Sequence, residues 1–128
     1  MRILLDTHAF LWWILDDPRW SPAAEAAVTG PASQVFVSAA TAWEITTKHR
    51  LGKLPGAEII AANVATRIAE EGFHELAVSV IHAQHAGALP GGHKDPFDRL
   101  LAAQAILENM LLISNDAAVD VFGVHRLW

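Results

Sequence analysis

The sequence contains no cysteine, so disulfide bonds and thiolate metal sites are excluded. It also lacks an apolar run long enough to span a membrane, because charged residues interrupt each run. Charged residues make up only 18% of the 128 residues and hydrophobic residues 52%, a balance typical of a folded domain. No secretory signal, internal repeat or linker is evident. We therefore expect one domain, residues 1–128, in the cytoplasm and without a membrane partner.

Positive charge is scarce as well. Nine Lys and Arg residues face 14 Asp and Glu residues, and the formal net charge is −5. A protein that coats nucleic acid by charge alone needs the opposite sign. An enzyme acting on nucleic acid is still compatible, because a carboxylate-lined metal site itself contributes negative charge. Contact with RNA would then require a local basic rim and metal ions.

Apolar runs alternate with helical patterns along the whole chain. The runs predict strands at 2–6, 34–38, 73–78 and 110–114, and a weak edge strand at 124–127. The intervening patterns predict helices at 7–15, 23–28, 39–50, 57–71, 79–88 and 95–109, with a short turn or helix at 117–122. Strands alternating with helices indicate an α/β sandwich with a mostly parallel sheet.

Four acidic residues fall near the ends of these predicted elements. Asp6 closes the first strand, Asp116 follows the fourth, and Glu44 lies within two turns of the end of the second. Asp98 lies in the first turn of the helix that leads to the fourth strand. Ligands of open parallel sheets bind beyond the carboxyl ends of the strands, so the topology would have to bring Asp98 to the same edge.

Carboxylates gathered in this way would need a cation. Two unit charges about 4 Å apart repel by about 4 kcal/mol at an effective dielectric near 20. Such groups therefore either bind protons or bind a positive ion. An oxygen-only cluster suits Mg²⁺ or Mn²⁺ better than Zn²⁺. These ions activate water and clamp phosphodiesters, which is nuclease chemistry.

Each acid also has a purely structural interpretation. Asp6 suits an Asx turn at a strand end, and Asp116 suits the start of a turn. Glu44 follows Thr41 at the spacing of a helix capping box. None of these residues is decisive alone, and the functional hypothesis depends on the set.

The segment before the last long helix holds two acids with different interpretations. Asp95 fits an N-cap with Pro96 at the first helical position, and Asp98 then lies three residues on, where the helix dipole favours an acid. We assign Asp95 to capping, with a supporting role beside the acidic site as the lesser alternative. Trp12 and Trp13 are interpreted as core or dimer surface. Basic residues that suit either a solvated helix end or a phosphate-binding rim are Lys48, His49, Arg50 and Lys53, joined by His93, Lys94 and Arg99.

Taken together, four segments resemble PIN-domain ribonucleases, and specifically the VapC-like toxins of type II toxin–antitoxin (VapBC) systems. The resemblance extends over almost the whole chain. It is carried by Ile3-Leu-Leu-Asp-Thr-His8, by Ser38-Ala-Ala-Thr-Ala-Trp-Glu-Ile45 with Lys48 and Leu51-Gly-Lys-Leu54, by His93-Lys-Asp-Pro-Phe-Asp-Arg-Leu-Leu101, and by Leu112-Ile-Ser-Asn-Asp116.

The resemblance implies a PIN-like three-layer α/β/α sandwich whose mostly parallel central sheet has four to five strands. It implies a metal-binding and catalytic quartet made of Asp6, Glu44, Asp98 and Asp116. Thr7 and Ser114 match small hydroxyl positions that orient a carboxylate or water. The implied activity is a Mg²⁺-dependent ribonuclease, an endonuclease, with Mn²⁺ as the alternative metal. The implied partners are an RNA substrate, a cognate VapB-like antitoxin and a second copy of the chain in a homodimer.

Two other functions remain open from the sequence. The first is a non-catalytic PIN-fold module that binds a partner, although the complete set of four acids favours catalysis. The second is a phosphohydrolase with Asp6 as nucleophile. The second lacks the acid expected two residues later, where His8 stands.

Overall fold

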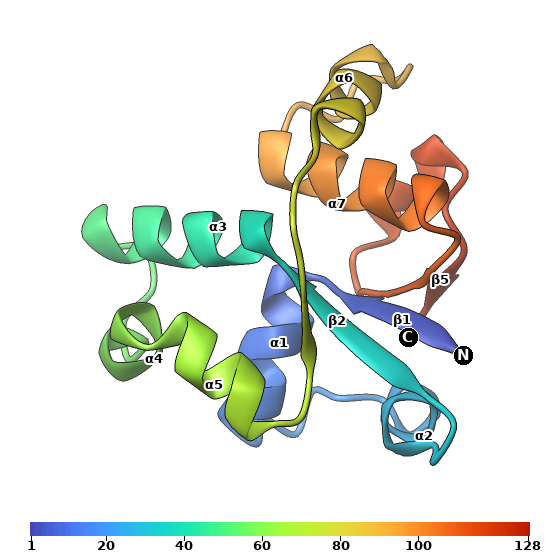
Figure 1. Ribbon diagram of the computed structural model, residues 1–128. Coiled ribbons are helices and arrows are strands. Elements are labelled where there is room, and N and C mark those ends of the chain that lie inside the picture. Colours follow the sequence, from blue (N-terminus) through green and yellow to red (C-terminus); the bar gives the residue numbers. More distant parts are fainter.

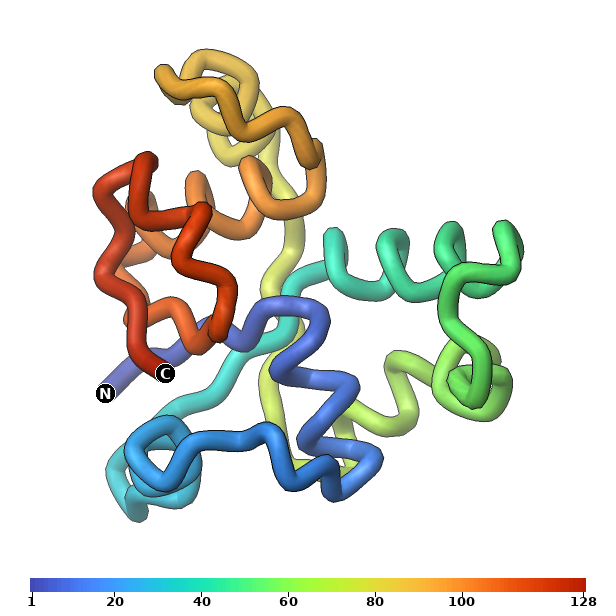
Figure 2. Tube along the Cα trace, turned by 180° about the vertical axis from the view of Figure 1, so that it is seen from behind, coloured from blue at the N-terminus to red at the C-terminus, as the bar shows by residue number.

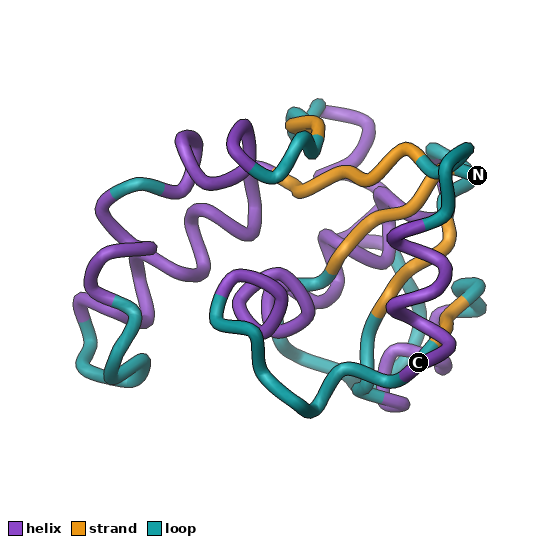
Figure 3. Tube along the Cα trace, turned by 90° about the horizontal axis from the view of Figure 1, so that it is seen from below, coloured by secondary structure: helices purple, strands orange, loops and turns teal.

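Five parallel strands form one central sheet in the computed structural model, which describes residues 1–128 (Figures 1 and 3). The central strand β1 (Arg2–Leu5) pairs with β2 (Gln34–Ser38) on one side and with β4 (Leu111–Ile113) on the other. The edges are β3 (His74–Leu76), beside β2, and β5 (Arg126–Leu127), beside β4. The sheet is therefore parallel throughout, and all its carboxyl ends share one edge.

Helices connect the strands close to the predicted positions. They are α1 (Thr7–Ile14), α2 (Pro22–Thr29), α3 (Ala39–Arg50), α4 (Glu58–Ala62), α5 (Val64–Glu70), α6 (Val80–Ala88), α7 (Pro96–Leu107) and a 3₁₀ helix, η1 (Ala117–Phe122). Serine side chains cap several starts, because a hydroxyl accepts a hydrogen bond from an otherwise free backbone N–H. Ser21 caps α2 and Ser79 caps α6 in this way.

The pleat of the strands divides the core between the two faces of the sheet. Ile3 and Leu5 belong to a cluster that also contains residues of α1, α2 and α5, whereas Leu4 belongs to a cluster with residues of α7 and η1. Helices thus cover both faces, and α6 packs on the outside of α7 (Figure 1). The view from behind shows α3 extending away from the C-terminal part of the chain (Figure 2). The expected three-layer α/β/α sandwich is confirmed.

One predicted element is wrong: the helix expected at 57–71 is two helices, α4 and α5. The break is at Asn63, whose backbone (φ −143°, ψ 36°) is not helical. Its side-chain amide donates to the carbonyl of Ile59 at 2.9 Å, the acceptor that its own N–H would use in a continuous helix. Asparagine offers the backbone this local alternative, which apolar periodicity does not register.

None of the helices combines the length and apolarity needed to cross a bilayer.

Candidate metal centre at the carboxyl edge of the sheet

Asp6 follows β1 directly and forms the N-cap of α1. Its Oδ1 accepts a hydrogen bond from the backbone N–H of Ala9 at 2.8 Å, so the residue is a helix cap and not only an Asx turn. Only 8% of Asp6 is exposed. Burial raises the pKa of Asp6 to about 6, and the negative charge of Asp98 adds to the rise. Hydrogen bonds from Ser114 and Ala9 and the charge on His8 lower this pKa but do not cancel the rise.

Glu44 is buried in the second turn of α3 and is held by two donors. The Thr7 hydroxyl donates to Oε1 at 2.5 Å, and the Lys48 ammonium donates to Oε2. Thr41 lies next to Thr7, with their hydroxyl oxygens 3.1 Å apart. The capping-box interpretation is wrong, because Ser38 caps α3 and Thr41 stands inside the helix. Burial lowers the pKa of Lys48, but its hydrogen bond and charge interaction with Glu44 reverse this and raise it overall.

Asp98 stands in the first turn of α7, as predicted. Asp95 caps this helix by accepting from the N–H groups of Phe97 (2.9 Å) and Asp98 (3.2 Å). One carboxylate oxygen of Asp98 lies 2.8 Å from Nε2 of His93. Burial raises the pKa of Asp98, the His93 hydrogen bond opposes the rise, and the charges of Asp95 and Glu44 add to it.

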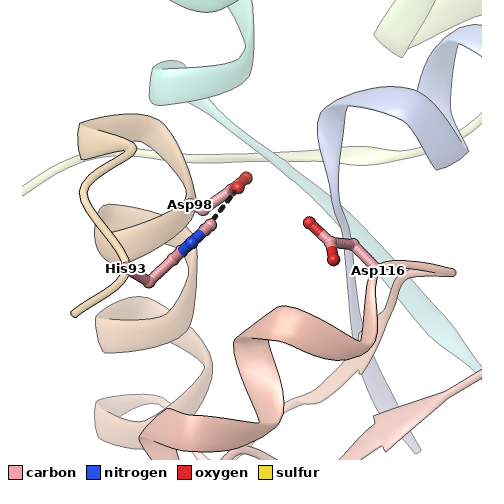
Figure 4. A group of neighbouring side chains, drawn as sticks. All are labelled: His93, Asp98 and Asp116. Atoms are coloured by element: carbon pink, nitrogen blue, oxygen red, sulfur yellow. Dashed lines mark hydrogen bonds and ion pairs between the residues drawn. The ribbon is translucent and has the colours of Figure 1, made fainter. Parts of the chain in front are cut away.

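Asp116 is exposed and follows β4 at the same edge. Its Oδ1 accepts from the N–H of Ala118 at 3.0 Å and so caps η1, while its own N–H donates to the Ser114 hydroxyl at 3.1 Å. Its carboxylate faces Asp98 and His93 (Figure 4). One ligand atom from each of these three side chains lies within 4.8 Å of the others.

The structure therefore brings the other three predicted acids toward Asp98, but not equally closely. Asp116 shares a tight group with Asp98. The charge of Glu44 raises the pKa of Asp98, and the charge of Asp98 raises the pKa of Asp6. Asp6 and Glu44 lie outside the tight group, which contains His93 instead. The sequence interpretation placed His93 in a phosphate rim and missed this position. A usable signal was the Gly91-Gly92 pair that precedes His93, because Gly91 (φ 111°) turns the chain before α7.

Two other members of the expected basic rim, Arg99 and Lys48, already have bonding partners within the protein. Arg99 donates hydrogen bonds to the carbonyls of Ala86 (3.0 Å), His93 (3.0 Å) and Leu89, which fastens the loop before α7. Lys48 is paired with buried Glu44. These side chains therefore organise the site rather than offering free charges at its surface.

The donor set suits a divalent cation. Carboxylate oxygens are the ligands that Mg²⁺ prefers, and an added imidazole nitrogen extends the range to Mn²⁺ and other first-row ions. Burial raises the pKa values of Asp6 and Asp98, so each carboxylate is costly to ionise at this edge in the protein alone. A positive ion would remove this penalty, so the residues fit a metal centre.

Comparison with known proteins identifies the family of the chain. A stretch of 56 residues, 44% of the chain, is 41% identical to Ribonuclease VapC16 of Mycobacterium tuberculosis, and it spans only 40% of that protein's length. Among solved structures, VapBC2 from Rickettsia felis bound to a promoter DNA fragment superposes with a TM-score of 0.72 at 16% identity, covering 99% of this chain and 98% of that one. DNA-bound VapBC from Salmonella typhimurium gives 0.70 at 19% identity, covering 99% and 97%. The family model of the PIN domain matches residues 3–123, so this chain belongs to the PIN domain family.

Proposed function

We propose that this chain is a metal-dependent endoribonuclease and the toxin of a type II toxin–antitoxin pair. The observation that carries the proposal is the convergence of Asp98, Asp116 and His93 beside buried Asp6 and Glu44. A similar protein that bears the name ribonuclease supports the reaction class. The metal is Mg²⁺, with Mn²⁺ as the alternative.

In this proposal the acids divide the work of holding the ion. Asp6, Asp98 and Asp116 present oxygens at the edge of the sheet, and Glu44 completes the pocket directly or through water. Thr7 and Lys48 fix the orientation of Glu44 by binding both of its oxygens. His93 holds Asp98 or supplies a ligand itself. When bound, a divalent ion supplies an activated water and charge compensation at a phosphodiester.

The partners follow from the same proposal. The substrate is RNA, and a cognate VapB-like antitoxin silences the enzyme by covering the site. The enzyme acts in the cytoplasm as a homodimer of single-domain chains, residues 1–128. Structural neighbours described as VapBC assemblies support the antitoxin partner.

RNA cleavage with purified protein tests the activity. Wild-type protein should cut RNA with Mg²⁺ and stop cutting with a chelator, and Asp6→Asn and Asp98→Asn should both abolish cleavage. Asp120→Asn is the matched control, because Asp120 is an exposed acid of η1 that pairs with Arg126. Undiminished cleavage by the Asp6 and Asp98 variants would refute the proposal.

One observation favours the alternative of a non-catalytic partner-binding module. Lys48 forms an ion pair with buried Glu44, and His93 contacts Asp98, so two of the four acids have a protein partner without any metal. A titration by calorimetry separates the two functions. Absence of heat at millimolar Mg²⁺ and Mn²⁺ would support the binding module, whereas saturable binding lost in Asp98→Asn supports the enzyme.

A further inference from the structure

A hollow outside the acidic quartet is lined by residues of α1, of the loop after α1 and of α2. The loop that joins α1 to α2 lies at the bottom of Figure 1, whereas α7 lies at the top. The volume of the hollow is about 550 Å³. The wall combines aromatic rings with carboxylates, and its residues are Trp12, Trp13, Pro18, Trp20, Asp16, Asp17 and Glu25. None of these residues belongs to the acidic quartet.

The aromatic wall is a fixed platform. Four of the five tryptophans form a continuous chain of ring contacts, with centroid distances of 5.6 Å for Trp12–Trp128, 5.2 Å for Trp128–Trp20 and 5.2 Å for Trp20–Trp13. The indole N–H of Trp13 donates to Glu71 at 3.1 Å, which anchors the platform to the end of α5. Tryptophan is the best aromatic partner for a cation.

The charge of the hollow is negative and only partly compensated. Arg19 is the only basic side chain of the α1–α2 loop, and its guanidinium donates to both oxygens of Asp17 at 3.0 and 2.8 Å. The carboxylates of Asp16 and Glu25 have no hydrogen-bond or ion-pair partner. The guanidinium carbon of Arg19 also lies 4.3 Å from the centroid of the Trp12 ring. The chain itself thus places a guanidinium between an indole face and a carboxylate here.

We propose that this hollow binds an organic cation through an alkylammonium or guanidinium group. Three carboxylates repel phosphate, so a nucleic acid backbone does not suit the site. A bare metal ion does not suit it either, because these carboxylates do not converge as the ligand atoms of His93, Asp98 and Asp116 do. Indole faces with free carboxylates match a large, weakly hydrated cation. Its source is either a free polyamine or an arginine side chain of a protein.

Calorimetric titration with two probes tests the proposal: spermidine and acetyl-arginine amide, with acetyl-citrulline amide as the neutral control. The variant is Asp16→Asn/Glu25→Gln, which keeps the shape of both side chains. Asn also tolerates the left-handed backbone of Asp16, φ 52°. The double variant should bind both probes at least about tenfold more weakly than wild type does, since two carboxylates that would contact the cation are lost. Glu58→Gln/Glu75→Gln makes the same change in net charge at two exposed positions elsewhere and should bind like wild type.

A second variant should act in the opposite direction. Arg19→Ala frees Asp17 and the face of Trp12, so the probes should bind about threefold more tightly. Arg50→Ala removes an exposed positive charge at the end of α3 and should leave the affinity unchanged. If binding tightens in Arg19→Ala but not in Arg50→Ala, the cation binds specifically in the hollow and is not held by general charge attraction.

The two probes distinguish the sources. Tighter binding of spermidine assigns the hollow to free polyamines, and tighter binding of the arginine amide assigns it to a protein side chain. Three results would overturn the proposal: no binding of either cation at millimolar concentration, equal weakening in the two double variants, or loss of binding in Asp98→Asn. The last result would place the cation at the acidic quartet.

Discussion

Thr7 donates a 2.5 Å hydrogen bond to Glu44, which joins the first turn of α1 to the second turn of α3. Both residues are buried, so the carboxylate cannot exchange this donor for water. Thr7→Val should therefore destabilise the protein by about 1–3 kcal/mol, since it leaves a buried acceptor unpaired. Urea unfolding measures the loss. Thr7→Ser keeps the hydroxyl and serves as control, and equal stability of the Val and Ser variants would contradict the prediction.

Asp6→Asn should stabilise the metal-free protein at neutral pH. The folded state raises the pKa of Asp6 from 3.8 to about 6, so the associated stability is complete below pH 4 and is lost as the pH rises through 6. A rise of about two in the pKa corresponds to at most about 3 kcal/mol in the free energy of unfolding. Asparagine still accepts the Ala9 N–H and does not ionise.

Urea unfolding in a chelator at pH 4 and pH 7.5 checks this. The gain of Asp6→Asn over wild type should be small at pH 4 and largest above pH 6. Added Mg²⁺ should then stabilise wild type but not the variant. A gain that is the same at both pH values would show that ionisation of Asp6 is not its cause.

His93→Ala separates a metal ligand from a residue that only positions Asp98. As a ligand, the imidazole nitrogen favours Mn²⁺ over Mg²⁺, so the variant should lose about tenfold or more in Mn²⁺ affinity and less in Mg²⁺ affinity. Calorimetric titration of both ions gives the ratio. An equal loss for the two ions would assign His93 to positioning through its 2.8 Å contact with Asp98. His125→Ala, at an exposed histidine outside the group, is the control.

Asp95→Ala should weaken the start of α7. The side chain caps two backbone N–H groups, and loss of an N-cap costs about 0.5–2 kcal/mol. Thermal unfolding should show the loss, and Asp95→Asn should recover most of it because the amide oxygen also caps. If Asp95→Ala left the stability unchanged but abolished metal binding, its role would be in the site and not in the helix.

The sequence predicted the order of elements, the parallel sheet and the edge at which the acids meet. It did so because apolar strands buried on both faces and helix caps such as Ser21 and Asp95 are local signals. It failed at Asn63, where a side-chain amide replaces a helical hydrogen bond. Through the family resemblance Thr7 was expected to orient a carboxylate or water, but the sequence did not identify Glu44 as its partner, and it missed the contact of His93 with Asp98. These depend on how α1 meets α3 and how a glycine loop folds back, which no local pattern specifies.

Asp6 and Asp116 each use one carboxylate oxygen to cap a helix. Glu44 and Asp98 cap nothing. A descendant of this chain that had lost its activity would still need a helix-capping side chain at the first two positions, where Asn serves as well as Asp. Glu44 and Asp98 would then be free to change by mutation, and Glu44 would be a buried acid without a function. In related sequences, retention of Glu44 and Asp98 is therefore the better diagnostic of a working enzyme.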